Sequence, residues 1–123
     1  RGSEGEVYQV RELDTSVRRA AKLYFPHRDP QHKLTIRHAQ KLDLLRHCPI
    51  VLQYHHSEYL TIRRHKVIAL VSELCEGTQL QKWIEAHPRK RLSTYQALHV
   101  LYNLVRGLEA VHALGEYHAD VHT

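Results

Sequence analysis

The feature that most constrains this sequence is a change of pattern at Gly77, where a strand-like half of the chain gives way to a helical half. Before Gly77, apolar residues fall in short runs bounded by polar turns, which is typical of strands. After it, they recur at the three- and four-residue spacing of helices. Strands followed by helices, rather than the two in alternation, favour an α+β fold with two lobes joined near residues 73–78.

The first half contains four predicted strands and one predicted helix. The strand segments are residues 6–11, 17–24, 51–59 and 66–73. A short polar turn separates the first two, so they are expected to pair as an antiparallel hairpin. The longest apolar run, residues 67–71, suits a buried strand. Residues 33–46 are expected to form a helix with His38 on its apolar face. The apolar residues at helical spacing in that segment are Leu34, Ala39, Leu42 and Leu45.

The second half contains two predicted helices. A short one covers residues 80–84 and ends before Pro88. The longer one begins with a capping box, because Ser93 is followed three residues later by Gln96. Its apolar residues repeat at spacings of four and three, and they are Ala97, Leu101, Leu104, Leu108 and Val111.

The charge balance is basic, with 18 lysines and arginines against 13 acidic residues and a formal net charge of +5. Such a balance is compatible with nucleic-acid binding, but here the positive residues are scattered. The tight clusters, residues 63–66 and 89–91, fall in predicted loops, where charges are usually solvated. No nucleic-acid partner is therefore expected. No apolar run approaches the ~20 residues of a membrane-spanning helix, so no membrane segment is expected within this chain.

Cys48 and Cys75 are the two cysteines of the chain. Both lie beside apolar segments and form no metal-type pair, so they are expected to be small buried residues rather than ligands. This cysteine usage fits a reducing, cytoplasmic setting.

Two segments of the first half carry residues suited to phosphate chemistry. Gly2 and Gly5 allow a backbone to approach a phosphate closely, although a Gly-x-x-Gly spacing alone also occurs in ordinary turns. Lys22 lies in an otherwise apolar strand, where an ammonium is costly without an anionic partner. The hairpin would let Lys22 reach a phosphate held by the glycine turn. A lysine on the exposed face of a two-sided strand is the alternative.

A third segment, directly after the long helix, alternates His118, Asp120 and His122 on one side of an extended chain. Such a trio could bind a divalent metal, or Asp120 could act as a base while His118 holds the loop in shape. No second motif of metal-binding residues recurs at matching spacing, which favours a catalytic or structural loop over a metal site.

In this order, the motifs resemble the eukaryotic-type (Ser/Thr) protein kinase domain, in a bacterial-looking variant. The segments that carry the resemblance are residues 2–7, 20–22, 42–51, 71–77 and 107–120. The resemblance implies an α+β, bilobal kinase-like fold, with an antiparallel sheet and one helix in the N-lobe. Residues 1–72 would be most of the N-lobe, residues 73–78 the hinge, and residues 79–123 the first helices of the C-lobe.

The resemblance also implies a role for particular residues. Lys22 would hold the α- and β-phosphates of ATP, and Asp120, helped by His118, would accept the proton of a protein substrate's hydroxyl. Ser72 would be the gatekeeper beside adenine. The residues that would surround the nucleotide are Gly2, Ser3, Glu4, Gly5, Val7, Ala20, Lys22, Glu73 and Cys75. The ligands of Mg²⁺ are expected downstream of residue 123, so no metal site is expected within this chain.

Departures from the family pattern leave alternatives open. The helix over residues 33–46 contains no Glu, and His38 stands where the ion-pair partner of the lysine is expected. Ala119 replaces the usual Arg of the catalytic loop. His122 stands where protein kinases commonly have Lys, and it is typical of the aminoglycoside and choline phosphotransferases. The interpretations are thus an ATP-dependent Ser/Thr protein kinase, which the hinge favours, a pseudokinase or scaffold that binds without transfer, and a small-molecule phosphotransferase.

The register of these motifs also bears on the length of the chain. It places residue 1 inside the glycine loop and residue 123 just after the catalytic aspartate. The chain by itself is therefore expected to be an inactive fragment. It is also expected to be poorly stable, because Leu101, Leu104 and Leu108 would lack part of the core they pack against.

Overall fold

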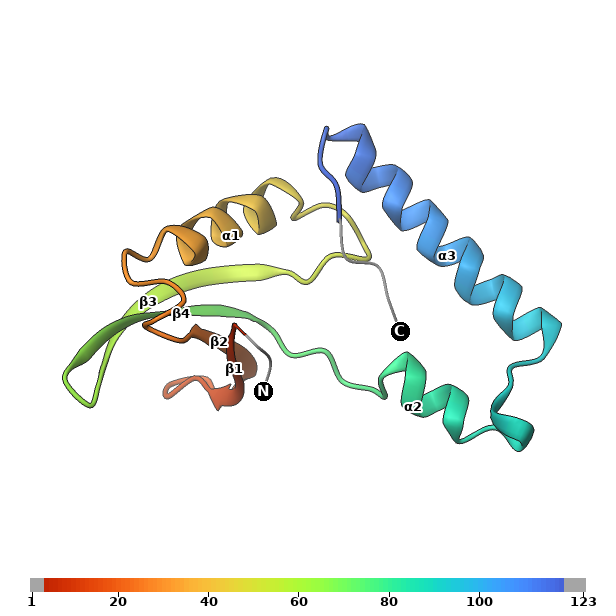
Figure 1. Ribbon diagram of the computed structural model, residues 1–123, viewed down its shortest axis with the longest axis horizontal. Helices are drawn as coiled ribbons and strands as arrows, with labels where there is room; N and C mark the ends of the chain where they lie inside the picture. Colours follow the sequence, from red (N-terminus) through yellow and green to blue (C-terminus); the bar gives the residue numbers. More distant parts are fainter. Residues whose placement is uncertain (1–3, 119–123) are drawn as a thin grey trace. The chain divides into compact units, whose positions relative to one another are not determined.

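The computed structural model describes residues 4–118, which divide into two compact units. The first unit runs to His47 and resumes over Val51–Cys75, and it contains the strands and one helix (Figure 1). The second unit comprises Cys48–Ile50 and the chain from Glu76 onward, and it contains the other helices. None of the helices in the described part of the chain is long and apolar enough to cross a membrane.

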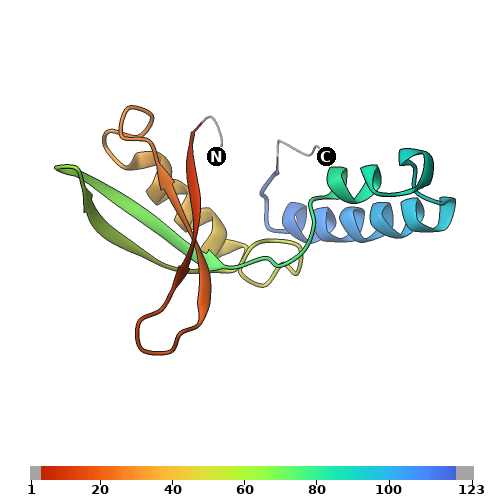
Figure 2. The same cartoon turned by 90° about the horizontal axis from the view of Figure 1, so that it is seen from below.

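The first unit is built on a four-stranded antiparallel sheet with the order β1-β2-β4-β3. Its strands are β1 (Gly5–Arg11), β2 (Arg18–Tyr24), β3 (Tyr54–Ile62) and β4 (His65–Glu73). The predicted hairpin of β1 and β2 is confirmed, with Gly5 opposite Tyr24 and Val7 opposite Lys22. Figure 2 shows the β1–β2 and β3–β4 hairpins running in clearly different directions, as the twist of a sheet requires.

The strands of the β3–β4 hairpin extend further toward its turn than the sequence predicts, so the turn is shorter. The strands continue to Ile62 and from His65, so the turn is reduced to Arg63 and Arg64. Both residues have positive φ, 47° and 70°, as a two-residue hairpin turn demands. β3 in turn begins at Tyr54 rather than at residue 51, and the basic cluster therefore lies partly within a strand.

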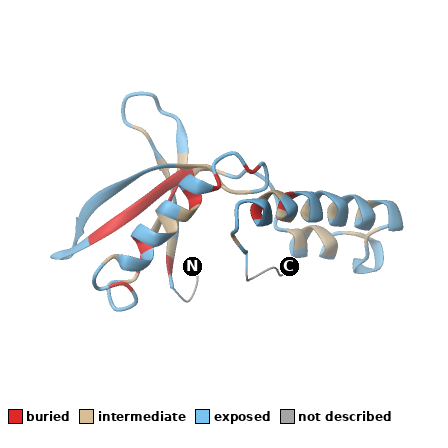
Figure 3. Ribbon diagram, turned by 90° about the horizontal axis from the view of Figure 1, so that it is seen from above, coloured by how far each residue is buried: buried red, intermediate tan, exposed pale blue. Residues whose placement is uncertain are grey.

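β4 forms the centre of the core in the first unit. Residues 67–71 are all buried, with none more than 6% exposed. β2 pairs with one edge of β4 and β3 with the other, which leaves its backbone groups satisfied on both sides. Figure 3 shows this strand as the longest buried stretch of the sheet. The prediction of a buried strand from its apolar run is confirmed.

Helix α1 (Lys33–Leu44) packs against β3 and β4 on one face of the sheet (Figure 2). Its buried face contains Thr35 and Leu42, and Leu45 follows directly after the helix. Leu34, which the helical spacing places on the buried face, is 45% exposed, whereas Thr35 is 1% exposed. That detail of the prediction is wrong, because a polar anchor turns Thr35 inward.

The anchor is Asp29, four residues ahead of the helix. Its carboxylate accepts hydrogen bonds from the backbone N–H groups of Leu34 (3.0 Å) and Thr35 (2.8 Å) and from the Thr35 hydroxyl (2.7 Å). These bonds satisfy backbone donors that the first turn of a helix leaves unpaired. Burial acts to raise the pKa of Asp29, but the bonds from Thr35 and Leu34 outweigh it and hold the pKa below its usual value.

The second unit contains α2 (Leu80–Glu85), a 3₁₀ helix, η1 (Pro88–Lys90), and α3 (Thr94–Ala113). The capping box of α3 is confirmed. The Ser93 hydroxyl accepts from the Gln96 N–H at 3.2 Å, and the Gln96 side-chain oxygen accepts from the Ser93 N–H at 2.9 Å. Leu98, Leu101 and Val105 of α3 are each more than half exposed.

Residues 48–50 belong to this second unit because Ile50 lies on α3. A Cβ added to Gly107 would overlap the side chain of Ile50, so Ile50 would have to shift to admit a side chain there. Cys48 is buried, as predicted. Cys75 is exposed, and that prediction is wrong, because the ladder of β4 ends at Glu73 and the chain then leaves the sheet. Both cysteines are free.

Candidate functional site

Several of the predicted site residues share one face of the sheet. Val7 lies directly opposite Lys22, and Ala20 precedes Lys22 by two residues, so the three side chains project from the same face. Ser72 of β4 lies opposite Ala20 and therefore shares this face. Tyr24, two residues after Lys22, contacts α1, which shows that this is the face the helix covers. Val7 is 60% exposed, so the face is open beside the helix.

Lys22 has the anionic partner that its strand position requires. Its Nζ lies 4.0 Å from the Glu4 carboxylate and 4.5 Å from the centroid of the Tyr24 ring. The Lys22 side chain is 29% exposed, so the ammonium reaches the surface with its stem covered. The structure thus brings together Glu4, Lys22 and Tyr24, of which Glu4 and Lys22 are predicted site residues.

His38 of α1 joins the same cluster. The Tyr24 hydroxyl lies 2.6 Å from His38 Nδ1, and the two rings meet edge to face with centroids 6.3 Å apart. Burial lowers the pKa of His38 below its usual value, the charges of Lys22 and Lys41 lower it further, and Glu4 acts in the opposite direction. The lowered pKa favours the neutral imidazole, which accepts the hydrogen bond of the Tyr24 hydroxyl at Nδ1 in the tautomer that carries its proton on Nε2.

The glycine segment approaches β2 very closely. A Cβ added to Gly5 would overlap the carbonyl oxygen of Leu23 and would lie 3.0 Å from the Tyr24 Cα. Backbone atoms cannot move aside as a flexible side chain can, so this position requires glycine. Gly2 and Ser3, the other predicted members of the segment, lie outside the described residues.

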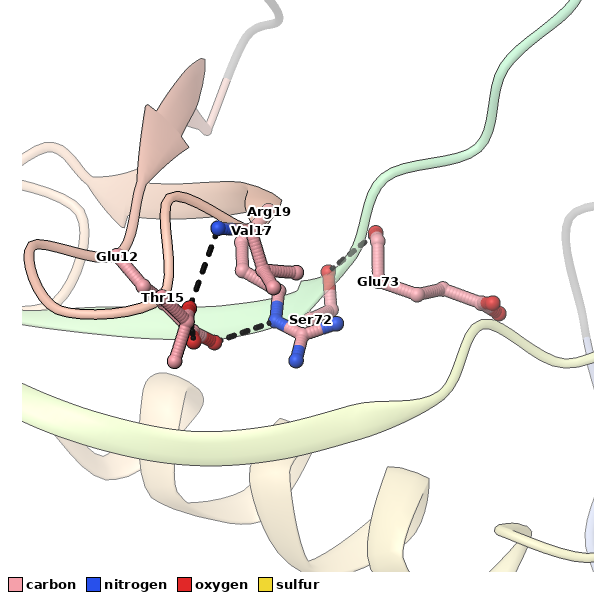
Figure 4. Close-up of polar contacts among 6 residues, drawn as sticks. All are labelled: Glu12, Thr15, Val17, Arg19, Ser72 and Glu73. Atoms are coloured by element: carbon pink, nitrogen blue, oxygen red, sulfur yellow. Dashed lines mark hydrogen bonds and ion pairs between the residues drawn. The ribbon is translucent and has the colours of Figure 1, made fainter.

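The predicted hinge residues lie at the end of β4. Ser72 is buried, and its hydroxyl donates to the Glu73 carbonyl at 3.3 Å (Figure 4). The Glu73 N–H donates to the Gln53 carbonyl at 2.9 Å, and the Glu73 carboxylate accepts from the Gln53 N–H at 2.8 Å. Glu73 is therefore fixed to the chain that leads into β3, whereas Cys75 is exposed beyond the sheet.

A polar cluster at the β1–β2 turn was not anticipated from the sequence. Arg19 Nε lies 2.8 Å from the Glu12 carboxylate, which also accepts from the Thr15 hydroxyl (Figure 4). The hydrogen bonds from Thr15 and then Arg19 lower the pKa of Glu12. Arg19 of β2 lies opposite Glu73 of β4, so this cluster stabilises the β1–β2 turn close to the predicted hinge. The sequence feature that could have predicted this cluster is a polar turn with an acidic residue, Glu12, on one side and a basic residue, Arg19, on the other.

The third predicted motif lies at the end of the described residues. His118 is exposed, and Asp120 and His122 lie outside the part of the chain that the structure describes. Within residues 4–118, no group of three His, Cys, Asp or Glu side chains could hold a metal ion. The roles of Asp120 and His118 therefore stay predictions from the sequence.

Comparison with known proteins gives one clear result. The family model described as the protein kinase domain matches residues 1–123, the whole of the chain. The match thus spans both units and also the segments at either end that the structure does not describe. No curated protein matches the chain.

Proposed function

Since the chain belongs to the protein kinase family, we propose that it serves ATP-dependent phosphoryl transfer to a Ser or Thr hydroxyl of a protein. The family match, with the four-stranded antiparallel sheet and the helices that follow, confirms the predicted α+β kinase-like fold and its N-lobe and early C-lobe elements. It also supports a kinase-type phosphotransferase. ATP is the phosphoryl donor of such a reaction, and a cytoplasmic location would supply it.

The observation that carries the proposal is the open face on which Val7, Ala20 and Lys22 lie together. This face suits a nucleoside triphosphate. The Lys22 ammonium can pair with the phosphates, and the small, apolar side chains of Val7 and Ala20 can pack against a flat base. Lys22 would hold the α- and β-phosphates, while Val7 and Ala20 would contact adenine. The backbones of Glu73 and Cys75 would hydrogen-bond the edge of the base.

The glycine segment would cover the phosphates. Its proposed members are Gly2, Ser3, Glu4 and Gly5. Gly5 fixes where the segment joins the sheet, because its backbone passes too close to β2 for any side chain. Mg²⁺ would neutralise the developing charge. Within residues 4–118, no group of three His, Cys, Asp or Glu side chains could hold it.

In the proposed reaction Asp120 accepts the proton of the substrate hydroxyl, and His118 orients the loop. Both assignments depend on the sequence motif. His122 in the same segment is the feature that keeps a small-molecule phosphotransferase as an alternative.

A pseudokinase or scaffold is the second candidate, and a specific observation favours it. α1 presents the neutral His38 to the neighbourhood of Lys22, where a carboxylate would draw the ammonium into place. The carboxylate that does lie near Lys22 is that of Glu4, and it would compete with phosphate for the ammonium. Such a site could bind nucleotide without transferring phosphate.

Binding and transfer separate these candidates when both are measured on the full-length protein. MgATP affinity is measured by calorimetry, and transfer by radiolabel incorporation into a panel of protein substrates and of aminoglycosides. A kinase should lose transfer in both Lys22→Met and Asp120→Ala, whereas Lys82→Met, a lysine of α2, serves as the control. Affinity for ATP without transfer in the wild type would favour the pseudokinase. Transfer that survives Asp120→Ala would refute the enzymatic proposal.

A further inference from the structure

The orientation of Lys22 needs an explanation, because α1 offers it no carboxylate. Asp43 is the one acidic residue of α1, and it pairs with Arg46 at 3.3 Å near the end of the helix. The Lys22 ammonium instead lies over the face of the Tyr24 ring. A cation over an aromatic face is attracted by the negative potential of the ring, so the ring constrains where the ammonium can lie.

Tyr24 can serve as a fixed support because it is held on both sides. It is buried in β2, opposite Gly5, whose lack of a side chain allows the strands to meet closely. Its hydroxyl, at the other end of the ring, is hydrogen-bonded to His38. A change in χ1 would swing the hydroxyl away from His38 and break that bond, and burial of the ring restricts its rotation about χ2, so the ring face stays presented to Lys22.

The state of His38 controls this bond. When neutral His38 carries its proton on Nε2, its Nδ1 accepts from the Tyr24 hydroxyl. A second proton would occupy Nδ1, reverse the bond and add a positive charge beside Lys22. A cavity of about 220 Å³ adjoins the pair. The charged groups around His38 are Lys22 from β2, Glu4 from the glycine segment, and Arg37 and Lys41 from α1.

We propose that Tyr24 and His38 form a hydrogen-bonded positioning pair that directs the Lys22 ammonium toward ATP, in place of a carboxylate on the helix. The inference rests on the proposed role of Lys22 in nucleotide binding. It assigns no chemistry to Tyr24 or His38, because both act through Lys22. Glu4 is the counter-ion that Lys22 exchanges for phosphate when nucleotide binds.

The test uses conservative variants of the full-length protein. Tyr24→Phe keeps the ring and removes the hydroxyl, and His38→Gln keeps a neutral hydrogen-bonding group. The matched control is Tyr54→Phe, which also removes a tyrosine hydroxyl that is hydrogen-bonded, here to Ser57 at 3.0 Å. Tyr24→Phe should weaken MgATP binding about five- to tenfold, as expected for one lost hydrogen bond. Tyr54→Phe should leave it unchanged, and thermal melts establish that each variant is folded.

The pH dependence provides a readout that a merely structural role would not change. Because ATP itself titrates near pH 6.5, the measured quantity is the ratio of wild-type to His38→Gln affinity. This ratio should change as the pH drops from 7.5 to 5.5, since only the wild type gains a charge at residue 38 and with it reverses the bond to Tyr24. In lysine-labelled protein, the Hε protons of Lys22 should also show an upfield ring-current shift, which Tyr24→Leu removes.

The outcomes distinguish this inference from the proposed function. If Lys22→Met weakens ATP binding but folded Tyr24→Phe and His38→Gln bind as the wild type does at every pH, the positioning pair is refuted. If Lys22→Met itself leaves ATP binding unchanged, the proposed role of Lys22 fails first, and the inference with it. Weakened binding in Tyr24→Phe with a flat affinity ratio across pH would refute the part assigned to His38.

Discussion

Replacing Asp29 by Ala should destabilise the first unit, because this loop carboxylate is buried and hydrogen-bonded to the start of α1. Asp29 is 4% exposed, although aspartate is usually found at the surface. Its carboxylate receives three hydrogen bonds from the first turn of α1. The substitution removes the acceptor of all three bonds, so the two N–H groups and the Thr35 hydroxyl lose their partner.

The magnitude follows from what each donor loses. Loss of a side-chain cap at a helix start costs about 0.5–2 kcal/mol. The Thr35 hydroxyl is buried, and leaving such a group unpaired costs about 1–3 kcal/mol. Part of this loss is recovered if Thr35 rotates toward another acceptor. The expected decrease in the free energy of unfolding is therefore about 2–4 kcal/mol.

Urea unfolding followed by circular dichroism measures the change, with hydrogen exchange of the Leu34 and Thr35 amides as a local reporter. Asp14→Ala in the exposed β1–β2 turn is the control and should change stability by less than about 0.5 kcal/mol. An Asp29→Ala protein within 0.5 kcal/mol of the wild type, with both amides equally protected, would refute the anchoring role.

The pH dependence of the same protein gives a second test. The folded pKa of Asp29 is lowered, so the unfolded state takes up its proton first, near the ordinary value of about 3.9. The stabilisation is therefore present above about pH 4 and is lost as the pH falls toward the folded pKa. Asp29→Asn should therefore reduce the loss of stability between pH 4 and the folded pKa. If the loss is the same in Asp29→Asn, it comes from other carboxylates.

Three further predictions concern glycines and a cap. Gly5→Ala should lower the free energy of unfolding by about 1–3 kcal/mol and weaken ATP binding, because the new Cβ meets the backbone of β2. Wild-type stability in a thermal melt and wild-type affinity in a binding isotherm would contradict it. Gly107→Ala should destabilise the wild type, because its Cβ meets Ile50. In an Ile50→Ala background the same change should stabilise the protein by up to about 1 kcal/mol, because alanine favours a helix more than glycine does. A double-mutant cycle without this change of sign would contradict the packing. Ser93→Ala should cost about 1 kcal/mol by urea unfolding, whereas an unaffected protein would show that the capping box contributes nothing.

Much of the local structure follows from the sequence alone. The capping box at Ser93, the buried run at residues 67–71 and the β1–β2 hairpin were all predictable. Each depends on residues only a few positions apart, whose geometry is set by the helical or strand period. The hairpin also allowed Val7, Ala20 and Lys22 to be placed on one face, since pairing across a short turn leaves little freedom of register.

The tertiary structure decided the features that join distant residues. Asp29 turns Thr35 inward in place of Leu34, and spacing cannot show this, because the anchor lies outside the periodic segment. Cys75 is exposed because the sheet ends two residues before it.

The surroundings of Lys22 depend on tertiary packing in the same way. The sequence placed His38 near the lysine only by resemblance to a family. The hydrogen bond from Tyr24 to His38 joins residues 14 positions apart and exists only because α1 packs on that face of the sheet. The sequence determines which side chains each element carries. The packing of α1 decides which of them lies beside Lys22, because that depends on how far the helix is rotated against the strands.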